Sequence, residues 1–173
     1  PLVEGLSLDE AFLDVTASQS LHGTGVEIAT KIKQLILDET GLKASVGVAE
    51  NKLVAKIASD LDKPDGLSVI TSANVHEKLD PVPVSVIPGI GKQTLVKLER
   101  LNIHTVADLR LAPDRDLESV FGRFAARTRE RASGIDNRAV VAEREEKSIS
   151  AEETYDTDLA DRGDMERELL RLA

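Results

Sequence analysis

Polar and apolar positions alternate at the start of the chain, and the alternation changes phase within a short acidic stretch. Apolar residues stand mostly at even positions before residues 9–10 and at odd positions after them: Leu2, Leu6 and Leu8, then Ala11, Leu13 and Val15. Successive side chains of a strand point to opposite faces, so a change of phase marks a break between strands. The pattern therefore predicts two strands that meet at a tight turn or a bulge.

The spacing then becomes helical, and further short strands follow. The expected elements are a helix over 24–39 that ends at Gly41, a buried strand over 43–49, a helix over 51–62 that Asn51 caps and Pro64 ends, and a short strand over 66–70. Together with the first two strands, the order is strand, strand, helix, strand, helix, strand. This order predicts an α/β layer in which helices pack on a sheet.

From about residue 72 onward the pattern is helical. The expected segments are a Gly-x-Gly turn at 89–91 followed by a helix, a break at 101–105, a second helix, and further helices over 114–122 and 123–134. A polar linker over 135–146 leads to residues 147–155, where alternation returns and predicts a new β element. Two domains and the start of a third are thus expected.

Composition narrows the class of protein. Hydrophobic residues make up 41% of the 173 positions and charged residues 31%, as in soluble globular proteins. The lack of cysteine excludes disulfides and thiolate metal sites, and three scattered histidines argue against a zinc cluster. No apolar run approaches the length of a membrane span and no signal peptide opens the chain, so we expect a cytoplasmic protein. The chain begins at Pro1 inside an expected strand and stops within the amphipathic run 164–173, so we expect both ends to be cut.

Charge is distributed unevenly along the chain. The net charge is −9. Residues 1–87 carry 7 basic and 13 acidic side chains, and residues 141–173 carry 5 and 11, so each of these segments has a net charge of −6. Residues 88–140 carry 10 basic and 7 acidic side chains, a net charge of +3. A phosphate backbone would therefore dock on the middle segment, although a solvated helical surface gives the same balance.

Asp9 and Glu10 stand side by side at the break between the first two strands. One interpretation is a capping box, with Ser7 as N-cap and Glu10 three residues later. A polar turn is a second, although no Gly, Asn or Pro lies here. A third is that the turn presents carboxylates to a divalent metal such as Mg²⁺. Composition alone leaves the three open.

Longer motifs favour the third interpretation. The matching stretches are S-L-D-E-A-F-L-D (7–14), residues 45–70, residues 86–109 (beginning V-I-P-G-I-G-K), E-R-A-S-G-I-D-N-R-A-V (130–140) and residues 143–155 (beginning E-R-E-E-K-S-I-S). In this order they resemble the palm, thumb and little-finger entry of Y-family DNA polymerases, the translesion enzymes, most closely the bacterial DNA polymerase IV type. The resemblance covers nearly the whole chain. It implies an α/β palm sheet with flanking helices over 1–71, a helical thumb with a helix-hairpin-helix over 72–136, a linker over 137–146, and the first little-finger strand within 147–173.

The resemblance also implies roles for single residues. Asp9 and Glu10 match carboxylates that hold two catalytic Mg²⁺ ions, and Glu10 is associated with the metal that serves the primer 3′-hydroxyl. Lys63 matches a lysine that contacts the triphosphate of the incoming deoxynucleotide. From the residues alone Lys63 is an ordinary solvated lysine that ends a helix. Lys52 and Lys56 share a helical face with no match of this kind, and we expect a solvated face there rather than phosphate contacts.

The turn at Gly89, Ile90 and Gly91 points to DNA more directly. Two glycines let the backbone approach a phosphate, and Lys92 and Lys97 on the following helix add positive charge. A helix-hairpin-helix of this kind holds a DNA backbone without reading bases. The alternative is a turn that only packs two helices together.

The resemblance is incomplete. The family's other metal-binding aspartate, its aromatic sugar-selecting residue and its fingers have no match in these residues, so we expect the 173-residue chain alone to be inactive. Asp14 is expected to be a strand residue away from the metals. Implied partners are primer–template DNA and a deoxynucleoside triphosphate, with a sliding clamp as a candidate through a segment beyond Ala173, and no membrane. Two other functions stay open: a non-catalytic DNA-binding remnant, and another palm-fold enzyme such as a nucleotide cyclase.

Overall fold

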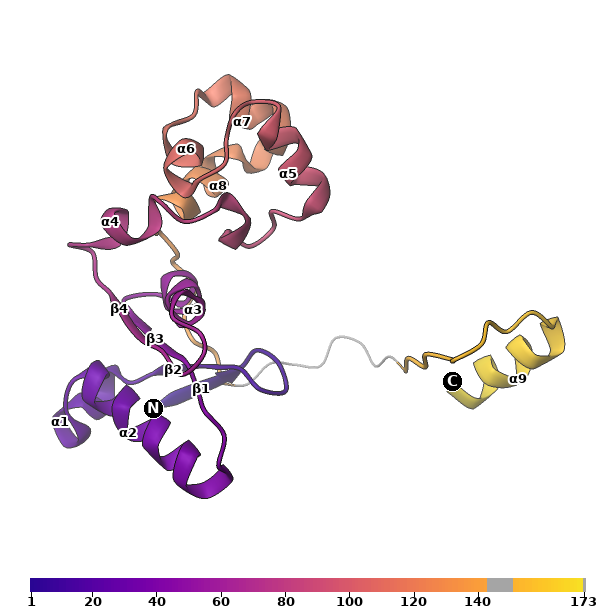
Figure 1. Cartoon of the computed structure of the whole chain (residues 1–173), viewed down its shortest axis with the longest axis horizontal. Helices are drawn as coiled ribbons and strands as arrows, with labels where there is room; N and C mark the ends of the chain where they lie inside the picture. Colours follow the sequence, from indigo (N-terminus) through magenta and orange to yellow (C-terminus); the bar gives the residue numbers. More distant parts are fainter. Residues whose placement is uncertain (143–150, 173) are drawn as a thin grey trace. The chain divides into compact units, whose positions relative to one another are not determined.

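A computed structural model describes residues 1–142 and 151–172. By its contacts the chain divides into two compact units, Pro1–Ala142 and Glu143–Ala173, and each is described by itself. In the first unit two short pairs of strands are interspersed with helices, and a further set of helices follows them (Figure 1). The elements up to residue 71 are β1 (Leu2–Gly5), β2 (Ala11–Asp14), η1 (Thr16–Ser18), α1 (Gln19–His22), α2 (Gly25–Thr40), β3 (Val46–Ala49), α3 (Lys52–Leu61) and β4 (Leu67–Ile70). The later ones are α4 (Val75–Leu79), η2 (Val84–Val86), α5 (Lys92–Glu99), α6 (Val106–Leu111), α7 (Asp114–Phe121), η3 (Gly122–Phe124) and α8 (Ala125–Ala132).

The first two strands form an antiparallel hairpin. Glu4 pairs with Phe12 and Gly5 with Ala11, and the N–H groups of Leu6 and Ser7 both donate to the carbonyl of Glu10, at 2.8 and 3.2 Å. The change of phase in the sequence thus correctly predicts a strand, a turn and a strand. The capping-box interpretation of Ser7 and Glu10 is wrong, because no helix begins there.

The expected helix over 24–39 is confirmed as α2, and its ends have the predicted chemistry. Thr24 accepts a hydrogen bond from the N–H of Glu27, and the Glu27 carboxylate accepts one from the N–H of Thr24, so this pair is a capping box. Gly41 ends the helix in the left-handed region, at φ 72°.

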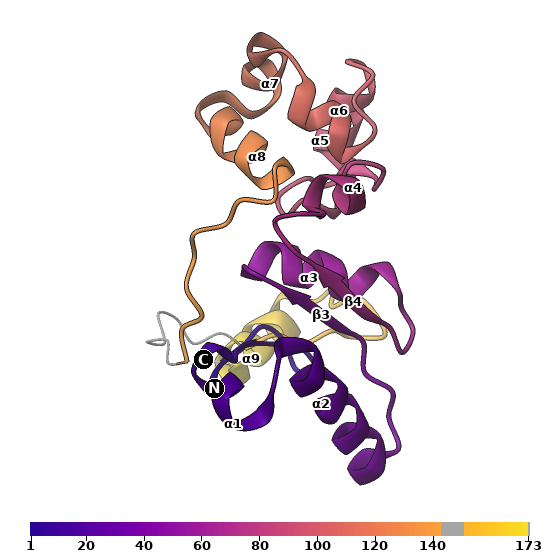
Figure 2. The same cartoon turned by 90° about the vertical axis from the view of Figure 1, so that its left-hand side faces the viewer.

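The strands β3 and β4 pair in parallel, with Val46 opposite Leu67 and Val48 opposite Val69. Helix α3 packs on them so closely that a Cβ added at Gly47 would overlap the carbonyl oxygen of Ala55. In Figure 2, α2 lies on the other side of this strand pair. We expected one sheet, but among the described residues β1–β2 and β3–β4 form two separate ladders. The expectation failed because alternation along a strand marks its faces and not its neighbours.

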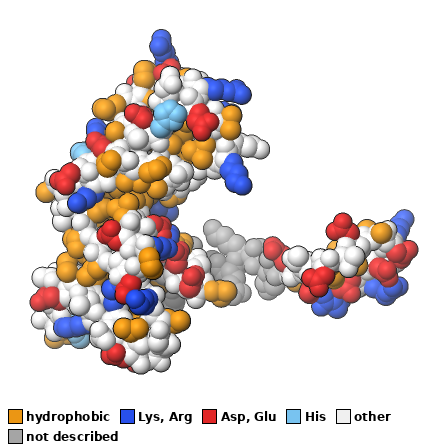
Figure 3. All heavy atoms as spheres, viewed as in Figure 1, with side chains coloured by type: hydrophobic (Ala, Val, Ile, Leu, Met, Phe, Trp, Pro, Cys, Tyr) orange, Lys and Arg blue, Asp and Glu red, His pale blue; other side chains and the backbone are white. Residues whose placement is uncertain are grey.

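Helix α3 lies between the β3–β4 pair and the later helices, and one hydrophobic core runs through all three (Figures 1 and 2). The expected helices after the turn at 89–91 are confirmed as α5, α6, α7 and α8. In Figure 3 hydrophobic side chains gather where α3 meets this helical part. The buried core residues are Leu53, Val54, Ile57, Ala58, Ile70, Leu79, Val84, Ile87, Ile90, Leu98, Ile103, Val106, Leu109, Ala112, Leu117, Ala125 and Ala132. This core contains residues from both sides of position 71, so it does not mark a boundary there, and the expected boundary between palm and thumb stays a prediction.

The last segment differs from expectation where the structure describes it. Residues 151–155 contain no strand, whereas a β element was expected over 147–155; residues 147–150 lie outside the described residues. The amphipathic run near the end of the chain forms α9 (Arg162–Leu172). Across the part of the chain that the structure describes, no helix has both the length and the apolar surface that a membrane crossing requires.

Candidate functional site

The hairpin loop between β1 and β2 presents Asp9 at the surface. The Ser7 hydroxyl donates to Asp9 Oδ1 at 2.7 Å. This hydrogen bond, with smaller contributions from the backbone and from the charges of Lys63 and Lys56, lowers the pKa of Asp9 below its ordinary value. Asp9 is therefore an ionised carboxylate at neutral pH, held in place by the loop that carries it.

Glu10 faces α3 and the residues that follow this helix. Its Oε1 lies 2.7 Å from Lys56 Nζ and 4.0 Å from Lys63 Nζ. The structure thus brings Asp9, Glu10 and Lys63 together, although Lys63 follows the acidic pair by more than fifty residues.

Asp60 completes a group of four charged side chains, Glu10, Lys56, Asp60 and Lys63, which we call the charge network. Asp60 Oδ2 lies 3.1 Å from Lys56 Nζ, and Asp60 Oδ1 lies 2.6 Å from Lys63 Nζ. Partial burial works to lower the pKa of Lys56, but its hydrogen bonds to Glu10 and Asp60 outweigh burial and raise that pKa. Burial works against the charge of Asp60 as well, and its hydrogen bonds to Lys63 and Lys56 keep its pKa below the ordinary value.

A buried ion pair fixes the hairpin one helical turn away. Lys52 Nζ lies 2.5 Å from Glu4 Oε2, and the two side chains are only 7% and 2% exposed. Lys52 also lies over the Phe12 ring, at 5.1 Å from its centroid, and donates to the carbonyl of Ala139 at 3.2 Å. The expectation of a solvated face is therefore wrong for Lys52, and Lys56 is an ion-pair partner of Glu10. No sequence signal reveals these pairs, because their members lie 48 and 46 positions apart.

The turn at residues 88–91 lies in the helical part. Gly89 has φ 95°, a conformation that favours glycine, and the Arg131 guanidinium of α8 donates to the carbonyl of Pro88 at 2.9 Å. The Ile90 side chain is buried, and its N–H donates to the carbonyl of Ile87, so this residue packs the turn against the core. Gly91 is the N-cap of α5.

Lys92 and Lys97 are exposed on α5. The first N–H groups of a helix have no acceptors within it, so the start of α5 beside Lys92 offers donors to an anion. Exposed cations and these donors together give the turn the chemistry to hold a phosphate backbone.

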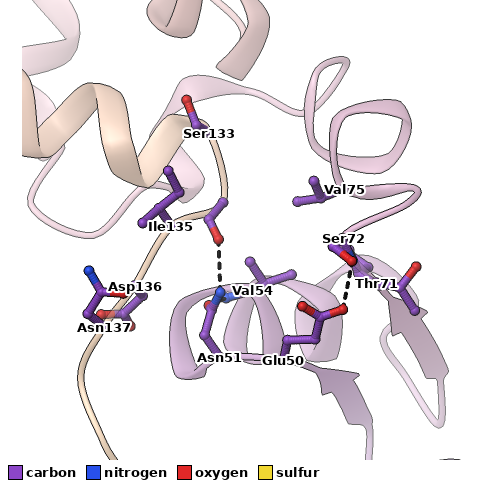
Figure 4. Close-up of a pocket in the computed structure, with 12 residues that line it drawn as sticks. Glu50, Asn51, Val54, Thr71, Ser72, Val75, Ser133, Ile135, Asp136 and Asn137 are labelled. Atoms are coloured by element: carbon purple, nitrogen blue, oxygen red, sulfur yellow. Dashed lines mark hydrogen bonds between the residues drawn. The ribbon is translucent and has the colours of Figure 1, made fainter.

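A cleft of about 360 Å³ lies elsewhere, between the start of α3 and the segment after α8 (Figure 4). The Asn51 side-chain amide donates to the carbonyl of Gly134 at 2.8 Å, and its oxygen accepts from the N–H of Val54 at 3.0 Å. Asp136 accepts from the N–H of Leu53 at 3.1 Å. Asp9, Glu10 and Lys63 are not among the residues that line this cleft.

The acidic pair offers hard oxygen donors, which suit Mg²⁺. Both carboxylates are accessible: Asp9 lies at the surface, and the Glu10 side chain is 34% exposed. Within residues 1–142 and 151–172, no three His, Cys, Asp or Glu side chains are grouped so that they could hold a metal. The described residues therefore contain no complete metal site, and Asp9 and Glu10 would need ligands from elsewhere. Asp14 lies at the far end of the hairpin, opposite Leu2, as expected for a strand residue.

Comparison with known proteins gives consistent matches. A model of the impB/mucB/samB family matches residues 1–60. A DNA polymerase IV of Ralstonia nicotianae is 47% identical over 169 residues, which cover 98% of this chain and 47% of the relative. A DNA polymerase IV of Xanthomonas campestris is 50% identical over 163 residues, covering 92% and 44%. The chain thus spans somewhat less than half the length of these curated relatives.

Solved structures agree in fold. A Y-family DNA polymerase chimera superposes with a TM-score of 0.71 at 35% identity, over 86% of this chain and 43% of that one. An insertion ternary complex of Dbh DNA polymerase gives a TM-score of 0.70 at 36% identity, over 80% and 41%.

Proposed function

Because this chain belongs to the Y family of DNA polymerases, we propose that it carries the acidic half of the active site and the duplex-holding part of a translesion polymerase. The observation that carries the proposal is the position of Asp9 and Glu10 on one hairpin loop, beside Lys63. The reaction would be template-directed addition of a deoxynucleotide to a primer 3′ end. Neither a non-catalytic remnant nor a nucleotide cyclase is favoured by the polymerase relatives.

Asp9 and Glu10 would hold Mg²⁺ through their carboxylate oxygens. When bound, the metal supplies charge neutralisation for phosphoryl transfer and lowers the pKa of the attacking hydroxyl. The Ser7 hydroxyl fixes one oxygen of Asp9, and Glu10 is paired with Lys56 of α3 in the metal-free chain. Lys63, half-exposed after the end of α3, would bind and orient the triphosphate. A third metal carboxylate would come from the family's other aspartate, so the 173 residues alone are expected to be inactive.

Residues 72–136 would form the thumb, with a helix-hairpin-helix whose turn at residues 89–91 leads into α5. Gly89 and Gly91 shape the turn, Ile90 anchors it in the core, and Lys92 and Lys97 face solvent where a duplex backbone would dock. The contacts would be to phosphates, and hence independent of base sequence. Residues 137–146 would be a linker and 147–173 the start of a little finger. A cytoplasmic location and a sliding clamp as partner remain part of the proposal.

Primer extension by the full-length gene product tests the proposal. Asp9→Asn and Glu10→Gln should each nearly abolish nucleotide insertion and leave the affinity for primer–template almost unchanged, because they remove metal ligands and not duplex contacts. Asp14→Asn, a matched change on the same hairpin, should keep activity. Near-normal extension by the Asp9 or Glu10 variant would remove that residue from the active site.

A further inference from the structure

The charge network balances two lysines against two carboxylates. Lys56 lies 2.7 Å from Glu10 and 3.1 Å from Asp60, so it bridges them. Lys63 lies 2.6 Å from Asp60 and 4.0 Å from Glu10, so its closer partner is Asp60. Each lysine thus has Asp60 as a partner that is independent of Glu10.

We propose that Asp60 is a holding carboxylate: when a divalent cation binds Glu10, Lys56 and Lys63 move from Glu10 to Asp60. The inference rests on the proposed function, since it concerns the same Glu10. It adds two positioning residues, Asp60 and Lys56, to which the resemblance assigned no role.

The positions of the side chains support this exchange. Asp60 lies four residues after Lys56 on α3, a spacing at which side chains meet on a helical face, and Lys63 reaches Asp60 from beyond the end of the helix. The lysine side chains are 29% and 51% exposed, so both have room to turn away from Glu10. Lys52 contrasts with them, because it is 7% exposed and held by Glu4 and the carbonyl of Ala139.

Electrostatics gives the exchange a direction. A divalent cation at Glu10 repels the two ammonium groups beside it, and this repulsion opposes metal binding unless the lysines move. The Asp60 carboxylate can pair with both ammonium groups, so neither lysine is left without a partner when it leaves Glu10. Without Asp60 the lysines would compete with the metal for Glu10.

The test measures Mn²⁺ binding by the 173-residue chain, from paramagnetic broadening of the amide signals of residues 9 and 10. Lys56→Gln should tighten binding roughly threefold, the effect of a partly exposed ion pair, because it removes a competitor. Asp60→Asn should weaken binding by a similar factor. Lys78→Gln and Glu77→Gln, which alter an exposed pair on α4, are matched controls that should change nothing.

A variant that lacks both lysines distinguishes two effects of Asp60: accepting the lysines from Glu10, and attracting the cation directly by its own charge. In a Lys56→Gln/Lys63→Gln chain, Asp60→Asn should leave the Mn²⁺ affinity unchanged, because Asp60 acts only through the lysines. A loss of affinity as large as in the parent chain would overturn the inference and make Asp60 a direct contributor to metal binding. An unchanged affinity in the single Lys56→Gln variant would overturn it too.

The proposed function fails in a distinguishable way. If Mn²⁺ broadens other residues and spares 9 and 10 in the parent chain and in Lys56→Gln, the metal site itself is wrong, and the inference falls with it. If Glu10→Gln abolishes the broadening while the Lys56 and Asp60 variants behave as the parent, only the exchange is wrong.

Discussion

The carboxylate of Glu4 in β1 and the ammonium of Lys52 in α3 lie 2.5 Å apart and are almost completely buried. Glu4 also accepts from the N–H of Val141 at 2.8 Å, and Lys52 donates to the carbonyl of Ala139. One ion pair thus joins the hairpin that carries Asp9 to α3 and to the segment that follows α8. The position of the acidic loop depends on this junction.

Breaking the Glu4–Lys52 pair should destabilise the first unit strongly. Glu4→Gln leaves the buried Lys52 ammonium without this carboxylate, which costs about 3–5 kcal/mol. The double change Glu4→Leu/Lys52→Met should recover much of that loss, because it removes both charges of the pair. Denaturant unfolding provides the free energies, with Glu77→Gln as an exposed control within about 0.5 kcal/mol of the parent. A single variant that costs no more than the control would show that the pair contributes nothing.

Asp136 should stabilise the start of α3 in a pH-dependent way. Its carboxylate accepts from Arg138 Nε at 2.8 Å and from the N–H of Leu53, and the Arg138 hydrogen bond is the main reason that its pKa lies below the ordinary value. The stabilisation is therefore complete above the ordinary carboxyl pKa of about 3.9 and is lost as the pH falls through the lower folded-state value.

We expect Asp136→Asn to cost about 1–2 kcal/mol between pH 5 and 8, and this difference should shrink below about pH 4. Urea unfolding of the parent and of Asp136→Asn across this pH range measures the difference in their free energies of unfolding. A difference that stays constant down to pH 2 would contradict the role of the charge.

Gly47 should tolerate no side chain. A Cβ there would overlap the carbonyl of Ala55 and approach the N–H of Ser59, both backbone groups of α3 that cannot turn away. Gly47→Ala should therefore destabilise by at least about 2 kcal/mol, as overpacking does. Gly5→Ala is the matched control, because it is also in a strand and has nothing within 4 Å of its added Cβ. Thermal unfolding measures the stability of both variants. Equal melting temperatures for Gly47→Ala and Gly5→Ala would contradict the close packing of α3 on Gly47.

Binding of DNA should depend on Lys92 and Lys97 and fall with salt. The chain should bind duplex weakly and without sequence preference, and the double change Lys92→Glu/Lys97→Glu should reduce both affinity and salt slope, by about one unit of slope per lost phosphate contact. The variant Lys43→Glu/Lys78→Glu changes the net charge equally and should have a smaller effect. Fluorescence anisotropy across salt concentrations measures both quantities. Equal affinities for parent and Lys92/Lys97 variant at every salt concentration would make the hairpin a packing turn.

A substitution at Gly91 tests whether DNA binding needs close approach of the backbone to a phosphate, independently of the lysine charges. Gly91→Val should weaken DNA binding by pushing the backbone away from the phosphate, with a smaller change in salt slope. Its φ of −91° suits any residue and its Cβ would meet nothing within 4 Å, so the chain should still fold, with about 1 kcal/mol lost because valine is a poorer N-cap than glycine. The same anisotropy titrations, with a melting curve to show that the variant is folded, test this; a folded variant that binds DNA as tightly as the parent would contradict it.

Local chemistry let the sequence predict most elements. Asn51 and Gly41 act within a few residues of the helix ends they define, so their effect can be predicted from neighbours alone. The alternation around Asp9 and Glu10 likewise predicted a hairpin, because strand faces follow from period 2. The longer motifs identified the family, and with it the candidate roles of Asp9, Glu10 and Lys63.

Only the tertiary structure decided which charges meet. The pairing of β1 with β2 and of β3 with β4 in separate ladders depends on contacts that a strand's own pattern does not encode. The same holds for Lys52 and Lys56, expected on a solvated face and found against Glu4 and Glu10. A charge that is exposed in an isolated helix becomes buried or paired only when a distant strand packs on it, and this depends on the fold as a whole.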